Sequence, residues 1–273
     1  MLAHQARPLE LENASMNWLE NLPPAPQLIK MSALTFVGAL ICWIIANHES
    51  HEIRPPLRAP PEMSVDPIQT PTASPPFIAK RGGENYEIEP VAEYEITGLV
   101  VQLHDSMSWQ DSTHLQAKDF INTRDLCVVW GDNLKNDIYR RVRFSHGDWT
   151  CYYQAFDAET FRLFKGNQLS NNHVLPATDS IAANMEKIEI GDQITLKGML
   201  VNYQRAQHPP PRKTSTTRDD TGNGACEIIW VTDFQMRHRA AKSWRAFRSV
   251  SLLALTASLL TLISGFALGL VRR

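Results

Sequence analysis

Two long apolar runs lie towards the ends of the chain, at 31–46 and 250–271, and neither carries a charged side chain. The second is long enough to cross about 30 Å of hydrocarbon at a rise of about 1.5 Å per residue. The alternative, a buried helix that is apolar on every face, needs a larger core than this chain can provide around it. We therefore predict a transmembrane helix at 249–271.

The first apolar run is shorter than the roughly 20 residues that usually span a bilayer, and it lies where a secretory signal peptide would lie. It ends at Asn47, His48 and Glu49, however, and not at the small residues of a cleavage site. We favour an uncleaved transmembrane helix at 31–47, and a removed signal peptide is the alternative. Residues 1–30 are mildly acidic and interrupted by proline, which predicts an N-terminal extension with little structure.

Proline dominates the stretch that follows the first apolar run. Eight prolines lie between Glu52 and Phe77. Each fixes φ and removes a backbone donor, so we expect that neither helix nor sheet propagates there. The pattern predicts an extended, semi-rigid spacer at 48–85.

The segment 86–236 has the pattern of a soluble, β-rich domain. Its strand candidates are rich in β-branched, aromatic or alternating apolar residues: Glu95–Leu103, Leu126–Trp130, Trp149–Phe156, Gln193–Tyr203 and Glu227–Phe234. Gly98 inside the first candidate indicates a bulge or a close backbone approach. An amphipathic helix at Ser180–Ile188 is capped by Thr178 or Asp179. The predicted fold is mainly β with one or two short helices, a small barrel compatible with the oligonucleotide/oligosaccharide-binding (OB) barrel, between two transmembrane α-helices.

Charge and motifs argue against several classes of function. The chain has 27 basic and 29 acidic residues, so as a whole it has no electrostatic preference for nucleic acid. The domain has no CxxC, HExxH or HxH pair and its histidines are scattered, so we predict no metal site and no cofactor. The Gly-rich stretch 220–224 lacks the Lys-Ser/Thr of a phosphate-binding loop, and a tight turn is its simplest interpretation.

Four motifs resemble a family of bacterial membrane-anchored proteins that has no assigned function. They are HEIRPP at 51–56, NHVLPATD at 172–179, GDQITLKGMLV at 191–201 and RDDTGNGACE at 218–227. The resemblance implies a domain outside the cytoplasm, tethered by the N-terminal helix, and it implies no activity, substrate or cofactor. This chain departs from the family pattern in carrying Cys127, Cys151 and a second apolar run.

The charges that flank the helices favour the opposite side of the membrane. Five basic residues precede the second helix in the segment 237–248, and only Arg272 and Arg273 follow it. Taken alone, the positive-inside rule puts the domain in the cytoplasm. We favour the exported side, as a two-pass protein of the bacterial inner membrane with a periplasmic domain, because the first helix usually sets the orientation. The basic segment 237–248 is expected to lie along the lipid headgroups in either case.

The domain has three cysteines, which is an odd number. Because Cys127 and Cys151 are both additions to the family pattern, our hypothesis is that they form a disulfide. The alternative is that Cys127, Cys151 and Cys226 are all buried free thiols.

Three classes of function stay open. The leading hypothesis is a membrane-anchored module that binds a protein or envelope ligand through loops at 171–179 and 218–227, with these candidate contacts: Asn172, His173, Arg218, Asp220 and Thr221. A thiol-dependent hydrolase or transferase is the alternative, with Cys226 as nucleophile, His173 as base and Asp219 or Asp220 orienting the base. Single-strand nucleic-acid binding through the basic stretch 204–218 is a third, and we expect it least for an exported domain. The expected partners are the lipid bilayer and another envelope protein, and the sequence does not predict an oligomeric state.

Overall fold

The computed structural model describes residues 24–53, 59–220 and 225–271, which form two units. One unit contains the two apolar helices, and the other is a β domain between His51 and Lys242. Two apolar helices therefore flank a mainly β domain in the sequence, as predicted.

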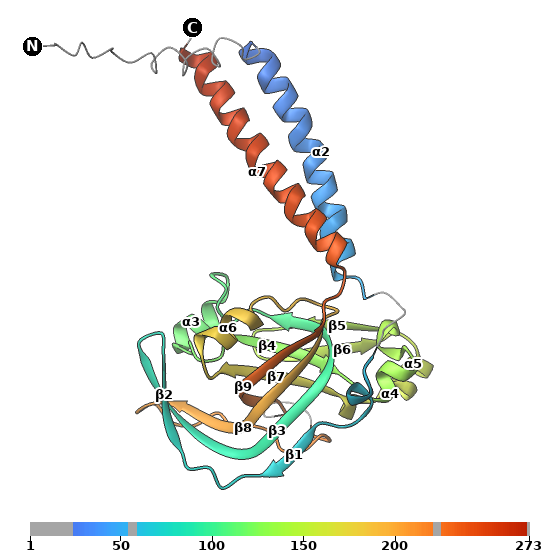
Figure 1. Cartoon of the computed structure of the whole chain (residues 1–273), viewed down its shortest axis with the longest axis vertical. Helices are drawn as coiled ribbons and strands as arrows, with labels where there is room; N and C mark the ends of the chain where they lie inside the picture. The colour runs from blue at the N-terminus through green and yellow to red at the C-terminus, as the bar shows by residue number, and fades with distance from the viewer. Residues whose placement is uncertain (1–23, 54–58, 221–224, 272–273) are drawn as a thin grey trace, which may run out of the picture. The chain divides into compact units, whose positions relative to one another are not determined.

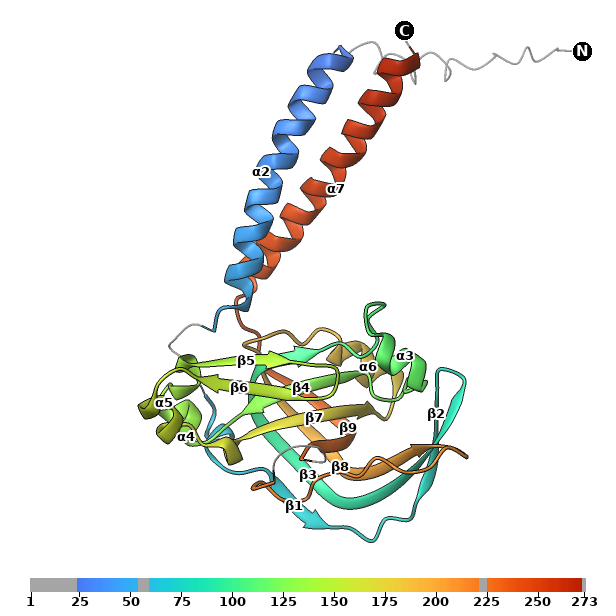
Figure 2. The ribbon, with the colours of Figure 1, turned by 180° about the vertical axis from the view of Figure 1, so that it is seen from behind.

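The helical unit consists of α2 (Ala25–His51) and α7 (Lys242–Val271), which lie side by side and antiparallel (Figures 1 and 2). Ser50, near the end of α2, accepts a hydrogen bond of 2.9 Å from Arg248, near the start of α7. At the other end of the pair, Gly265 faces Ile29 so closely that a Cβ would lie 2.9 Å from its Cγ1. Both helices are long and apolar enough to cross a membrane.

Both helices extend beyond the predicted bounds. α2 includes residues 25–30 and reaches 27 residues, so the first span is not short. α7 begins at Lys242, which divides the basic segment 237–248 between the end of strand β9 and the first turns of the helix. Of the predicted extension 1–30, residues 1–23 lie outside the described part of the chain.

Nine strands build the β domain, as far as its residues are described. They are β1 (Ile68–Pro71), β2 (Phe77–Arg81), β3 (Glu84–His104), β4 (Arg124–Val129), β5 (Val142–His146), β6 (Cys151–Ala155), β7 (Leu169–Pro176), β8 (Gln193–Arg205) and β9 (Glu227–His238). Seven form one sheet, in the order β1-β3-β4-β7-β9-β8 with β2 also paired to β3, and β5 and β6 form a separate hairpin (Figure 1).

Within the large sheet, β8 pairs with both β9 and β3. The pairings β3-β4-β7-β9-β8 therefore return to β3 and form a ring of five strands. The β7–β9 pair is parallel and the other ring pairs are antiparallel. The β5–β6 hairpin is inserted between the second and third strands of the ring.

Two glycines let neighbouring strands approach closely. A Cβ at Gly98 would lie 2.4 Å from Val128 Cγ1, and a Cβ at Gly198 would lie 1.9 Å from the carbonyl oxygen of Trp230. The register shifts of β3 lie at Pro90/Ala92 and Val100/Gln102. Gly98 thus marks a close approach and not a bulge, which decides between the two predicted alternatives.

The predicted amphipathic helix is α6 (Asp179–Met185), and Thr178 caps it by accepting a hydrogen bond from the backbone N–H of Ile181. Met185 and Ile188 are fully buried in the main core, against side chains of the ring strands. Three further short helices occur among the described residues of the domain: α3 (Ser112–Ala117), α4 (Asp132–Lys135) and α5 (Ala158–Leu163). The predicted count of one or two was too low.

Two expectations about irregular segments are wrong. The proline-rich stretch contains a 3₁₀ helix at Pro61–Ser64 and the strands β1 and β2. Pro61 begins the 3₁₀ helix and Pro71 ends the edge strand β1, two positions where a missing backbone donor is tolerated. The stretch 171–179 is not a loop, because most of it is β7, in which every residue after Leu169 is buried.

Candidate functional site

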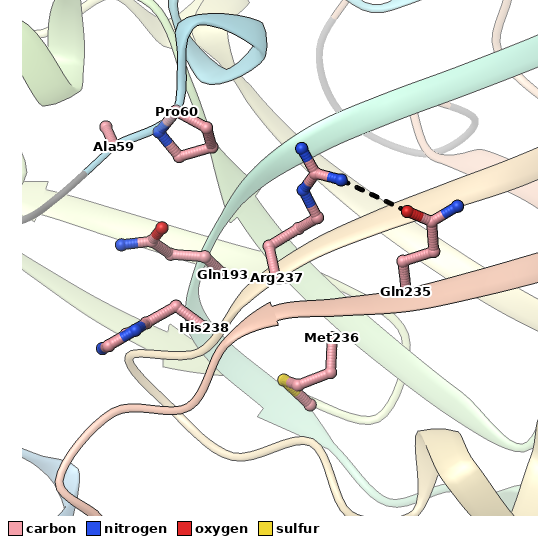
Figure 3. Close-up of a pocket in the computed structure, with 7 residues that line it drawn as sticks. All are labelled: Ala59, Pro60, Gln193, Gln235, Met236, Arg237 and His238. Carbon is pink, nitrogen blue, oxygen red and sulfur yellow. Dashed lines mark hydrogen bonds between the residues drawn. The ribbon is translucent and has the colours of Figure 1, made fainter.

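Two surface cavities of the β domain differ in their chemistry. The larger, of about 510 Å³, lies beside the end of β9 and is drawn in Figure 3. Two of its polar side chains lie on one face of β9, where Arg237 donates a hydrogen bond of 3.3 Å to Gln235, while Met236 points the other way. The smaller, of about 250 Å³, is lined by several buried or charged groups and is the stronger candidate site.

This smaller cavity, the loop pocket, lies between two connections of the ring. The β3–β4 connection supplies Lys118 and Asp119. The end of β8 and the β8–β9 connection supply Arg205, His208 and Arg212, and the remaining lining residues are Tyr86, Ala117, Trp149, Tyr203, Gln204 and Pro210. Lys118, Arg205 and Arg212 are cationic and Asp119 is anionic, so the pocket carries net positive charge.

Three neighbours hold Arg212 in place, and a fourth side chain, His173, lies beside it. Its Nη1 donates to the Tyr203 hydroxyl at 3.0 Å and to Asp119 Oδ2 at 3.3 Å. Its guanidinium lies 4.2 Å above the centre of a Trp149 ring, and Nη2 lies 3.0 Å from His173 Nε2. Such a guanidinium is preorganised, because little conformational freedom is left to lose when a ligand binds.

Burial and neighbouring charges determine the protonation of Tyr203 and Arg212. Burial raises the pKa of the Tyr203 hydroxyl well above its usual value, so the hydroxyl stays protonated and donates to Asp119 at 2.6 Å. Burial alone would lower the pKa of Arg212, but the hydrogen bond to Tyr203 and the negative charges of Asp119 and Asp125 outweigh burial and raise the pKa.

Two buried polar atoms of the pocket residues have no hydrogen-bond partner within the described part of the chain. They are Asp119 Oδ1, an acceptor, and Arg205 Nε, a donor. Leaving a buried polar group unpaired costs about 1–3 kcal/mol.

Behind the pocket lies a buried polar network centred on His173 in β7. Asp125 in β4 accepts from Asn122 at 2.8 Å and lies 2.6 Å from His173 Nδ1. Burial lowers the pKa of His173, but the charge and hydrogen bond of Asp125 outweigh burial and raise it to about 9. Contact with His173 in turn overcomes the burial of Asp125 and lowers its pKa.

The structure brings together two members of the predicted catalytic group. Cys226 is half-buried and lies beside His173, whose pKa it raises. Its Sγ accepts from Asn171 Nδ2 at 3.2 Å and donates to the carbonyl oxygen of Trp149 at 3.9 Å. The predicted orienting residues are elsewhere: Asp219 and Asp220 are exposed, and Asp220 accepts from Ser215. Asp125 holds the histidine instead, so the assignment of this role to Asp219 or Asp220 is wrong.

The predicted binding-loop residues are divided among several environments. Asn172 and His173 are fully buried, so they cannot contact a partner at the surface. Arg218 lies 2.9 Å from the buried Glu227 and donates to the Tyr94 hydroxyl at 3.1 Å, which gives it a structural role at the base of its loop. Asp220 is exposed, and Thr221 lies outside the described residues.

A second cluster of titratable groups was missed by the sequence analysis. His104 Nε2 and His114 Nδ1 lie 2.6 Å and 2.5 Å from the same oxygen of Asp111, Oδ2. Burial lowers the pKa of His114. Burial would raise the pKa of Asp111, but hydrogen bonds from His114 and His104 lower it. The only sequence signal is the spacing H-x6-D-x2-H, which matches no common metal motif.

A disulfide joins the inserted hairpin to the ring. It links Cys127 in β4 to Cys151 in β6, with a Cα–Cα distance of 5.9 Å. Trp149, which contacts Arg212, lies two residues before Cys151. No protein-family model and no curated protein matches the chain.

Proposed function

We propose that this protein is a membrane-anchored ligand-binding module of the bacterial cell envelope, and that its ligand is an acidic oligosaccharide bound in the loop pocket. The observation that carries the proposal is the position of this pocket, between the β3–β4 and β8–β9 connections of the five-strand ring.

The ring has the pairing pattern of an OB-like barrel. Its third and fifth strands, β7 and β9, are parallel, and a helix, α6, lies between its third and fourth strands. OB barrels bind oligonucleotides and oligosaccharides on the face of strands 2 and 3 and with the loops between strands 1 and 2 and strands 4 and 5. Those two loops correspond here to the connections that line the pocket.

The pocket chemistry favours a ligand with negative charge and several hydroxyl groups. Arg212, Arg205 and Lys118 supply positive charge, and guanidinium groups bind carboxylates with charge-assisted hydrogen bonds. A sugar hydroxyl both donates and accepts, so it can pair with the donors and acceptors that line the pocket, among them Lys118 and Gln204. Trp149 is already covered by Arg212 and by His114, whose ring centre is 3.7 Å away, which disfavours the stacking that nucleic-acid binding needs.

An envelope location is part of the proposal. Two helices suited to span a membrane on either side of the domain predict a two-pass topology with both termini on the side opposite the domain. We place the domain in the periplasm, because disulfides persist in oxidising compartments and are rare in the cytosol. The resemblance of the four sequence motifs to bacterial membrane-anchored proteins supports the same inner-membrane location.

Binding measurements on the full-length protein in detergent micelles test this proposal. We expect a uronic-acid oligosaccharide to bind and to change tryptophan fluorescence, and a neutral oligosaccharide and a single-stranded oligonucleotide to bind at least about tenfold more weakly. Arg205→Gln should weaken binding by about tenfold, whereas Arg162→Gln, on the exposed side of α5, should leave it unchanged. Preferential binding of the oligonucleotide, or equal losses in both variants, would reject the proposal.

A thiol-dependent enzyme is the second candidate, supported by the contact between Cys226 and His173. A histidine with a pKa of about 9 is protonated at neutral pH, and an adjacent imidazolium stabilises a thiolate. Asp125 would be the residue that orients the base. A small iodoacetamide probe tests this candidate: wild-type Cys226 should react much faster than in the His173→Gln variant, and equal rates would exclude an activated thiol.

A further inference from the structure

We propose that His104, Asp111 and His114 form a binding site for a divalent transition-metal ion, with Zn²⁺ as the best match. One candidate ligand atom of each side chain lies within 4.8 Å of the other two. Two imidazoles and one carboxylate, with a water in the fourth position, are a common ligand set of tetrahedral zinc. This site is separate from the ligand-binding function proposed above.

The three residues come from one short segment, which makes the arrangement local. His104 is the last residue of β3, Asp111 is the N-cap of α3, and His114 lies in the first turn of that helix. Asp111 Oδ1 accepts the backbone N–H of His114 at 2.9 Å, which leaves Oδ2 directed at both imidazoles. The carboxylate is therefore fixed by the helix cap before any ion binds.

Burial leaves one side of the cluster open. The side chains of Asp111 and His114 are 1% exposed, whereas that of His104 is 23% exposed. Trp149 covers the ring of His114, and His146 stacks on His104 with ring centres 5.5 Å apart. An ion would enter beside His104, and this is where a water could complete its coordination.

Metal binding at His114 requires a change in the orientation of its neighbour Asn122. Metal binding at Nδ1 places the remaining proton on Nε2, which lies 3.3 Å from Asn122 Nδ2. An imidazole bound to a metal usually donates its other N–H to an oxygen. The amide of Asn122 must therefore turn and present its oxygen. It then loses two hydrogen bonds, the one that it donates to Asp125 Oδ1 at 2.8 Å and the one that it accepts from the backbone N–H of Val174 at 3.2 Å.

The bound ion would hold the β3–β4 connection in place. His104 and His114 lie at the two ends of the first part of this connection, and Lys118 and Asp119 of the loop pocket follow shortly after α3. The ion would thus replace two hydrogen bonds to Asp111 by three coordinate bonds. Zinc binding involves no change of oxidation state.

Titration calorimetry with ZnCl₂ alone on the full-length protein, stripped of metal with a chelator, tests the site. We expect one Zn²⁺ per chain, and a visible d–d spectrum typical of tetrahedral coordination when Co²⁺ replaces zinc. His104→Ala, at the more exposed ligand, should weaken binding by at least about tenfold. His238→Ala, which removes an exposed histidine at the end of β9, should have no effect.

A second variant guards against loss of folding. Asp111→Asn keeps an oxygen that can cap α3 but removes the ligand charge, so it should also lose zinc while retaining the wild-type circular dichroism spectrum. The proposal is overturned if folded wild-type protein binds no zinc. It is also overturned if His238→Ala loses as much affinity as His104→Ala, or if His104→Ala and Asp111→Asn both keep wild-type affinity, because the ion is then held by other residues.

Discussion

Glu227 makes the stability of the domain depend on pH in a way that can be calculated. Its carboxylate is buried at the start of β9, where Oε1 lies 2.9 Å from Arg218 Nη1, and Oε2 has no hydrogen-bond partner among the described residues. Burial outweighs the attraction of Arg218 and raises the pKa of Glu227 from 4.5 to about 7. The folded protein therefore holds this proton more tightly than the unfolded chain does.

The sign and size of the effect follow from linkage. A raised pKa stabilises the fold fully below the unfolded pKa, and this contribution is lost as the pH rises from about 4.5 to about 7. For this shift, one group lowers the free energy of unfolding by about 2.5 kcal/mol between about pH 5 and about pH 8. Glu227→Gln resembles the protonated carboxyl and can still accept the hydrogen bond from Arg218, so this part of the pH dependence should disappear.

Denaturant unfolding of the full-length protein in detergent, followed by tryptophan fluorescence, measures the difference. Wild type should lose about 2.5 kcal/mol more stability than Glu227→Gln over the same pH range. Groups that do not interact with Glu227 titrate alike in both proteins and cancel in this comparison. Glu89→Gln, which changes an exposed glutamate on β3, is the matched control and should follow wild type. Parallel curves for wild type and Glu227→Gln would refute the reasoning.

Three further predictions follow from the same structure. Gly198→Ala should destabilise the domain by at least about 3 kcal/mol in thermal unfolding, because its Cβ would lie 1.9 Å from a backbone oxygen, and wild-type stability would contradict the register of β8 and β9. A reductant should lower the free energy of unfolding by about 3 kcal/mol, because the disulfide between Cys127 and Cys151 closes a loop with a sequence separation of 24 and restricts the unfolded chain. The reductant should not affect a variant with alanine at both positions. A topology reporter fused after Phe234 should report the exported side, and a cytoplasmic signal would remove the envelope assignment.

The sequence predicts those strands whose side chains follow a simple pattern. Each of the five predicted strands overlaps a strand of the domain, and α6 was found with its cap, because alternating apolar residues and a Thr178 cap are local signals. β7 was missed because Asn171, Asn172 and His173 look like a polar loop. Their polarity is satisfied inside the fold, for example by the hydrogen bond of 3.0 Å from Asn172 to the carbonyl of Leu126, which no local pattern reveals.

The candidate sites show the same limit at longer range. The sequence led to His173 and Cys226, because each lies in a distinctive motif, and the structure places them in contact. It could not identify Asp125, which lies 48 residues before His173 and is brought to it by the antiparallel pairing of β4 and β7. Arg212 likewise looks like one charge in a basic loop, until its pairing with Tyr203 places it over Trp149.

The disulfide connects the question of compartment to the question of function. It ties the β5–β6 hairpin to β4, and Trp149 beside this hairpin contacts both Arg212 of the loop pocket and His114 of the metal cluster. If the disulfide only stabilised the fold, reduction would lower the unfolding free energy and leave ligand affinity unchanged at temperatures where the protein stays folded. If it also positions Trp149, which lies two residues before Cys151, reduction should weaken both ligand and zinc binding in the folded protein. An oxidising compartment is then a condition for the binding sites themselves and not only for stability.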